Sequence, residues 1–105
     1  MSDERSHPEL ARLNELRGRV TEGSGELSPA VRRAAAAGSA VPAVARAYTD
    51  KVRHHAYKVV DRDIDELRAA RWSEDDIFEL TVATALGAGL SRLEHACRLF
   101  KEVRP

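Results

Sequence analysis

The sequence is poor in cysteine and in aromatic residues, and each shortage excludes a class of protein. One cysteine among 105 residues excludes an intrachain disulfide, a CxxC redox pair and a zinc site built from several thiolates. Aromatic residues make up 5% of the chain, and no segment alternates apolar and polar residues as a strand does. Helices are therefore the expected secondary structure.

Neither sign of charge is in excess. The chain has 17 Lys and Arg against 17 Asp and Glu, so its formal net charge is zero. This balance argues against a general nucleic-acid binder, whose affinity depends on surplus positive charge. No apolar run approaches the roughly 18 residues of a membrane span, and the first residues lack the hydrophobic stretch of a signal peptide. We therefore expect a cytoplasmic protein that binds neither nucleic acid nor membranes.

The pattern of caps and apolar spacing predicts an all-α fold, a compact bundle of about five helices. Each expected helix begins at a proline or at a side chain that can cap the first turn. The expected starts are Pro8, Ser28 with Pro29, Ser39 with Pro42, Asp61 or Asp63, and Ser73 with Asp76.

The length suits a single domain over residues 1–105. Within it we expect residues 1–7 to be disordered, residues 8–38 to form N-terminal helices and residues 39–101 to form the core. A domain of this size buries little more than about 60% of its extended-chain surface, so self-association would help to stabilise it.

The third and the last expected helices carry the longest apolar patterns. The third has a stripe from Val41 to Val59, which predicts about five helical turns. The last runs from Ser73 to about Lys101 and contains Gly87 and Gly89. Each glycine costs about 1 kcal/mol inside a helix, so the pair predicts a close approach to another helix, and one alternative function is a module that docks this face on another chain.

Residues 57–94 combine a short helix ending in small residues with the tight turn Arg71-Trp72-Ser73, which is of the type Gly-x-Ser/Thr with arginine at the glycine position. An acidic helix start at 74–76 and a long Ala/Gly-rich helix at 78–93 follow. This arrangement resembles the core of the carboxymuconolactone decarboxylase family, which includes the alkylhydroperoxidase D-like proteins. The resemblance implies an all-helical, alkylhydroperoxidase D-like fold and a homo-oligomer, either a dimer, a trimer or a hexamer.

The thiol branch of that family carries a CxxCxxxH motif and an upstream glutamate, which this chain lacks. The cysteines would fall near Ala56 and Val59, the histidine near Asp63 and the glutamate near Val44, and the chain's cysteine, Cys97, comes later. Thiol-dependent peroxidase activity is therefore not expected. The resemblance then implies a member without the redox dithiol, a small-ligand-binding or accessory homo-oligomer that needs no cofactor.

Four residues form the candidate catalytic site: Asp50, His54, His55 and Tyr57. They lie near the position of the family's active site, and decarboxylase members use histidine and carboxylate groups for proton transfer. Asp50 and His54 are four residues apart, so they share a helix face and the carboxylate could orient the ring. Adjacent helical residues point about 100° apart, so both histidines cannot face one pocket. The alternative is a structural role, with one ring on the surface and the other packed.

Asp50, His54 and His95 supply too few ligands in a recognisable pattern for a metal ion, so no metal site is predicted. Cys97 continues the apolar stripe of the last helix, which favours a small buried hydrophobe over a reactive thiol.

Two basic pairs, Arg32 with Arg33 and Lys51 with Arg53, are balanced by nearby acidic residues and predict solvated helix faces. The chain contains no P-loop, GxSxG, HExxH or dinucleotide-binding motif.

Overall fold

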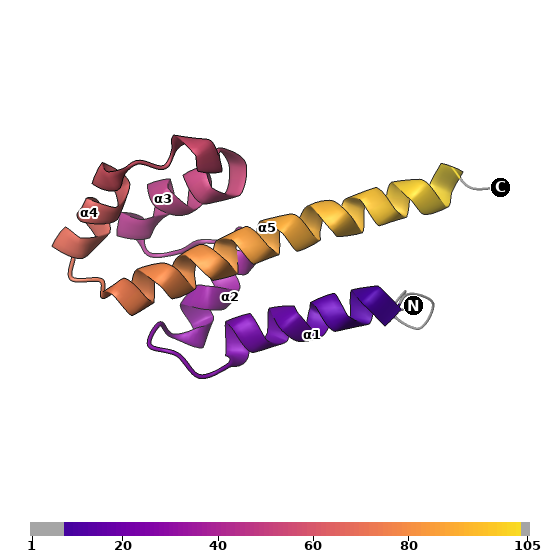
Figure 1. The fold of residues 1–105 in the computed structure, drawn as a ribbon, viewed down its shortest axis with the longest axis horizontal. Helices are drawn as coiled ribbons and strands as arrows, with labels where there is room; N and C mark the ends of the chain where they lie inside the picture. The colour runs from indigo at the N-terminus through magenta and orange to yellow at the C-terminus, as the bar shows by residue number, and fades with distance from the viewer. Residues whose placement is uncertain (1–7, 104–105) are drawn as a thin grey trace.

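The computed structural model describes residues 8–103, and the disorder expected for residues 1–7 lies outside them. Over the described range the chain forms five α-helices and a 3₁₀ turn with no strand, which confirms the all-α prediction (Figure 1). The elements are α1 (Pro8–Glu22), α2 (Pro29–Ala37), α3 (Ala43–His54), the 3₁₀ turn η2 (Ala56–Lys58), α4 (Asp61–Ala69) and α5 (Glu74–Val103).

The 30-residue helix α5 is the axis of the molecule (Figure 1). Its first half, residues 74–88, packs against α2, α3 and α4, and we call it the packed half. Its second half, residues 89–103, contacts α3 through the hydrogen bond from Arg92 to the Arg53 carbonyl and then continues beyond α2, α3 and α4 with α1 alongside, and we call it the open half. This extension makes the molecule long, with principal extents of 53 × 29 × 18 Å. No helix within the described range is long and apolar enough to cross a membrane.

The hydrophobic core lies between the packed half of α5 and the helices around it. Leu67 of α4 and Leu80 of α5 are fully buried, and the Tyr48 hydroxyl lies 2.6 Å from the Thr81 hydroxyl. A buried tyrosine hydroxyl needs such a partner. The core cluster consists of Leu27, Ala35, Val41, Ala45, Tyr48, Leu67, Ile77, Leu80 and Ala83.

The helix starts predicted at Ser28 and at Ser73 agree with the structure, whereas α3 begins at Ala43 without a side-chain cap and not at Ser39. Ser28 Oγ accepts a hydrogen bond from the backbone N–H of Val31 at the start of α2, and Gly38 ends that helix at φ 72°. At the start of α5, Ser73 Oγ accepts from the Asp76 N–H and the Asp76 carboxylate accepts from the Ser73 N–H, both at 3.0 Å. These bonds satisfy N–H groups that a helix leaves open at its first turn.

The five-turn helix predicted through Val59 is wrong, because α3 ends at His54. His55 leaves the helical region at φ −148° and ψ 54°, and the η2 turn follows. The chain then folds back, so that the Lys51 ammonium on α3 lies 2.8 Å from the Asp63 carboxylate on α4. That contact between two helices is not encoded in the local apolar spacing.

Gly87 confirms the predicted close approach, within the chain itself. A Cβ at this position would overlap the carbonyl group of Ala36, so the backbones of α2 and α5 touch here. Gly89 differs, because a Cβ added there would meet nothing within 4 Å. The face of Gly87 is therefore occupied by α2, and the alternative of a module that docks on another chain stays a prediction.

The connection between α1 and α2 is held by two side chains. Arg32 is 3% exposed and donates to the carbonyls of Leu27, Val20 and Gly23 at 3.0, 2.9 and 2.7 Å. Glu79 of α5 accepts from the Leu27 N–H at 3.1 Å. The prediction of a solvated face for Arg32 is wrong, because its guanidinium satisfies one carbonyl in the last turn of α1 and two in the connection that follows.

Candidate functional site

A cleft of about 410 Å³ lies between α1, α2, α3 and α5, and we call it the arginine cleft. Three different helices each supply an arginine to it, Arg17, Arg33 and Arg53. Two carboxylates line it as well. Arg17 Nη2 lies 3.1 Å from Glu94 Oε1, and Arg33 Nη1 lies 2.6 Å from Glu22 Oε1. The charged lining therefore has an excess of one positive charge.

Small residues form part of the cleft wall. Gly87 and Ala36 line it at the point where α5 and α2 touch. Arg53 lies beside them and donates from Nη2 to the carbonyls of Ala35 and Ala36 at 3.1 and 2.7 Å. These carbonyls are at the C-terminus of α2, where a cation is favoured. Arg53 is thus half buried and structured, and the solvated face predicted for it is wrong.

The ion pairs in the cleft are weak enough to exchange with a ligand. The side chains of Arg33 and Glu22 are 55% and 50% exposed, and those of Arg17 and Glu94 are 35% and 41% exposed. Pairs at this exposure contribute about 0–1 kcal/mol. A guanidinium binds a carboxylate through two parallel N–H donors, so an incoming carboxylate can replace either glutamate.

A second cavity of about 280 Å³, which we call the histidine cavity, lies between α3 and the segment that follows α2. Asp50 and His54 both line it, together with Thr49 and two arginines, Arg46 and Arg53. Two of the four predicted site residues thus lie at one cavity, as their four-residue spacing predicts. No hydrogen bond or ion pair of the described structure joins Asp50 to His54, so the carboxylate does not orient the ring in this state.

The other two predicted residues point elsewhere. His55 and Tyr57 are exposed and line neither the arginine cleft nor the histidine cavity. Their rings meet edge to face at 6.0 Å, and Tyr57 is 81% exposed. His55 diverges from His54 because α3 ends between them, which turns the backbone outward.

Within the described range, no group of three or more His, Cys, Asp and Glu side chains is placed to hold a metal ion. His95 is exposed on the open half of α5 and does not line the histidine cavity with Asp50 and His54. Cys97 is half buried on the same part of α5.

The predicted site does not include Arg17 or Arg33. Their positions in the chain share no motif with Arg53, and the partner of Arg17 lies 77 residues away at Glu94. Only the packing of α1 beside α5 brings these groups together, so no signal in the sequence identifies them.

Comparison with protein-family models, with curated proteins and with solved structures finds no match to this chain. The fold and site define an all-α protein with two polar cavities that share Arg53. The resemblance of residues 57–94 to the carboxymuconolactone decarboxylase family stays a prediction.

Proposed function

We propose that this chain binds a small organic acid in the arginine cleft, as a cytoplasmic, carboxymuconolactone decarboxylase-like protein without the redox dithiol. The observation that carries the proposal is the convergence of Arg17, Arg33 and Arg53 from three helices on one cleft. In this proposal the protein is a ligand-binding or accessory homo-oligomer and not a thiol peroxidase.

The cleft has the size and the surfaces that such a ligand requires. Its volume of about 410 Å³ lies in the range of small-molecule sites. The arginines offer paired donors to a carboxylate, while Ala36, Ala37 and Gly87 provide a wall for an apolar ring or chain. A ligand with one carboxylate and a small apolar body matches both surfaces.

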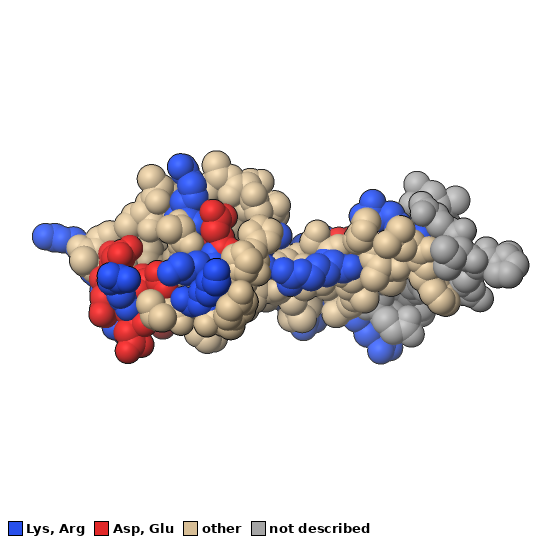
Figure 2. Space-filling view, turned by 90° about the horizontal axis from the view of Figure 1, so that it is seen from above, with Lys and Arg blue, Asp and Glu red and all other residues tan. Residues whose placement is uncertain are grey.

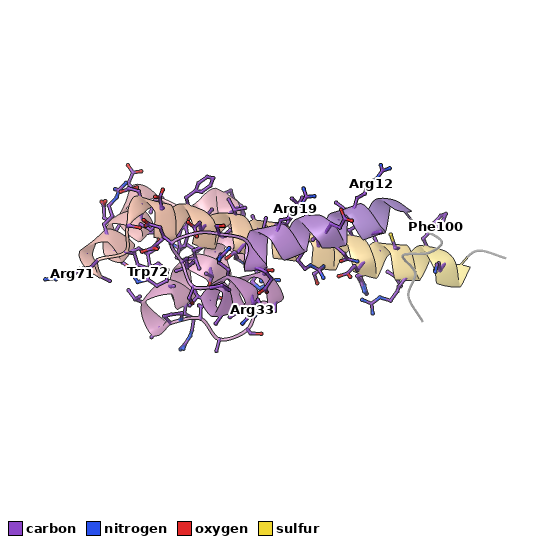
Figure 3. The ribbon with its side chains drawn as sticks, turned by 90° about the horizontal axis from the view of Figure 1, so that it is seen from below. Arg12, Arg19, Arg33, Arg71, Trp72 and Phe100 are labelled. Atoms are coloured by element: carbon purple, nitrogen blue, oxygen red, sulfur yellow. The ribbon has the colours of Figure 1, made fainter. Side chains whose placement is uncertain are left out.

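The test is isothermal titration calorimetry with benzoate and phthalate as probes and benzamide as the uncharged comparison. We expect the two acids to bind and benzamide to bind at least about tenfold more weakly, because a charge-assisted hydrogen bond contributes about 1.5–3 kcal/mol. Arg33→Gln should weaken benzoate binding by a similar factor. Arg12→Gln is the matched control, since Arg12 projects from the edge of α1 that faces away from Arg33 (Figure 3).

Two results would contradict the proposal. One is equal binding of benzoate and benzamide, which would show that the arginines do not select a carboxylate. The other is equal loss of affinity in Arg33→Gln and Arg12→Gln, which would reflect the overall charge of the protein instead of the cleft.

A second candidate function is proton transfer at the histidine cavity, in a decarboxylase-like reaction of an acidic substrate. It is favoured by the position of His54 and Asp50 at one cavity with Arg46 and Arg53, which offer charge to hold an anion. If carboxymuconolactone is decarboxylated, His54→Ala should abolish release of carbon dioxide, whereas His55→Ala should retain it because His55 lies outside the cavity. Equal activity in the two variants would assign His54 a structural role.

A further inference from the structure

One face of α5 is apolar along most of the helix and largely exposed. Other helices reach its edges, since Phe78 and Val82 line a small cavity with residues of α1 and Arg92 donates to the Arg53 carbonyl on α3. Phe78 is 68% exposed at one end and Leu99 is 48% exposed at the other. The side chains between them are exposed or half buried and are mostly small. The face consists of Phe78, Val82, Ala85, Gly89, Arg92, Ala96 and Leu99, and Arg92 is its one charged residue.

We propose that this face binds the same face of a second copy of the chain, with the two α5 helices antiparallel. The residues recur at alternating intervals of four and three, which is the heptad spacing of a left-handed coiled coil. Antiparallel pairing about the centre of the face places Val82 opposite Leu99 and Ala85 opposite Ala96 of the second copy. Val82 and Leu99 then meet toward the two ends, the alanine pairs lie inside them, and Gly89 faces position 92 at the centre.

The pairing gives Gly89 a reason to be glycine. Nothing within the described chain lies within 4 Å of a Cβ added at Gly89, yet a glycine inside a helix costs about 1 kcal/mol. The pairing places Gly89 opposite position 92 of the second copy, where the missing side chain lets the two helices approach closely. Arg92 itself reaches sideways to donate to the Arg53 carbonyl of its own chain.

The charges along α5 select the antiparallel orientation. Residues 74–79 carry four carboxylates and no basic residue, whereas residues 91–101 carry three basic residues and one acidic residue. Figure 2 shows the acidic side chains gathered at the end of the molecule formed by α4 and the start of α5. An antiparallel pair places the acidic end of one helix near the basic end of the other, whereas a parallel pair would place the acidic ends together.

The chain exposes more surface than a compact monomer of its mass. Its accessible surface is 7193 Å², whereas a compact monomer of 11.6 kDa is expected to expose about 5,800 Å². The excess of about 1,400 Å² reflects the elongated shape of the molecule. A second copy covers part of this excess and leaves the arginine cleft, on the other side of α5, accessible to ligand.

Sedimentation equilibrium of the full chain tests the interface. We expect the wild type to approach twice the mass of one 11.6 kDa chain at protein concentrations up to about 100 μM. Ala85→Arg should raise the dissociation constant roughly 100-fold, because it adds bulk and positive charge beside Arg92 of the second copy. Ala47→Arg is the matched control, since Ala47 is an exposed alanine on α3. A monomeric wild type, or equal effects of the two substitutions, would overturn the proposal.

Cysteine crosslinking tests the orientation, in a Cys97→Ala background. Ala85→Cys with Ala96→Cys should yield a covalent dimer on mild oxidation, because the two positions face each other. Ala85→Cys alone should remain uncrosslinked, since the two copies of residue 85 are then roughly 16 Å apart along the axis, beyond the reach of a disulfide. A covalent dimer of Ala85→Cys alone would show a parallel pair and overturn the geometry.

Discussion

The two halves of α5 have similar apolar composition and opposite environments. The packed half buries Ile77, Leu80 and Ala83 against α2, α3 and α4, whereas in the open half Leu90 is buried and Leu93 and Leu99 are 38% and 48% exposed. The comparison teaches that leucine and alanine content does not determine burial within a helix. What differs is the number of neighbouring helices that pack on each half.

The largest expected difference between the halves concerns a deleted leucine side chain. Leu80→Ala should lower the free energy of unfolding by about 3 kcal/mol, because it leaves a cavity at a fully buried position. Leu99→Ala should change it by less than about 0.5 kcal/mol at a protein concentration that keeps the chain monomeric. Urea denaturation followed by circular dichroism measures both unfolding free energies. Similar losses of stability in the two variants would contradict the expected difference between the halves of α5.

The two glycines should respond to the same substitution with opposite signs. Gly87→Ala should destabilise the chain by about 2 kcal/mol, because the new methyl group forces α2 away from α5. Gly89→Ala should stabilise the monomer by up to about 1 kcal/mol through improved helix propensity. Thermal denaturation of the two variants side by side is the measurement. Destabilisation by Gly89→Ala in the monomer would reveal an intrachain contact there.

A smaller effect is expected at the turn that leads into the packed half. Arg71 has φ 70°, and the Trp72 N–H donates to the Leu67 carbonyl at 3.1 Å, as in a Schellman motif. Glycine adopts this φ without the steric cost that arginine bears, so Arg71→Gly should stabilise the chain by about 0.5–1 kcal/mol. Ala69→Gly, inside α4, is the control and should destabilise it by about 1 kcal/mol. A loss of stability in Arg71→Gly would contradict this account.

The smallest effect is a dependence on pH at the α3–α4 contact. The hydrogen bond from Lys51, with a second from the Val60 N–H, holds the pKa of the Asp63 carboxyl below its ordinary value. A lowered pKa means that this stabilisation is complete above the unfolded-state pKa and is lost as the pH falls through the folded-state pKa. Stability of the wild type should therefore fall below about pH 4, and that of Asp63→Asn should fall less steeply. Parallel pH profiles of the two proteins would contradict the assignment.

The features that could be predicted from the sequence are those with local causes. The caps at Ser28 and Ser73 and the stop at Gly38 depend on bonds within a few residues, and the structure contains them. The end of α3 at His54 and the burial of Arg32 depend on contacts between helices. Periodicity within one segment does not report such contacts.

The candidate site residues also fall into those placed by local spacing and those placed by contacts between helices. Asp50 and His54 are brought to one cavity by the four-residue spacing of a single helix, so the sequence suffices to pair them. Arg17, Arg33 and Arg53 come from three helices, and their convergence requires the packing of α1 and α2 on α5. Tyr57 lies outside the cavity because the helix that would have carried it toward Asp50 ends before it.

Arg53 lines both the arginine cleft and the histidine cavity, so a single guanidinium serves two sites. If anions bind in both cavities as proposed, an anion that engages Arg53 from one side weakens the binding of an anion on the other side. Coupling free energies are reciprocal, so each anion would lower the affinity for the other by the same factor. The proposed ligand of the arginine cleft would then compete with the proposed substrate beside His54, without contact between the two.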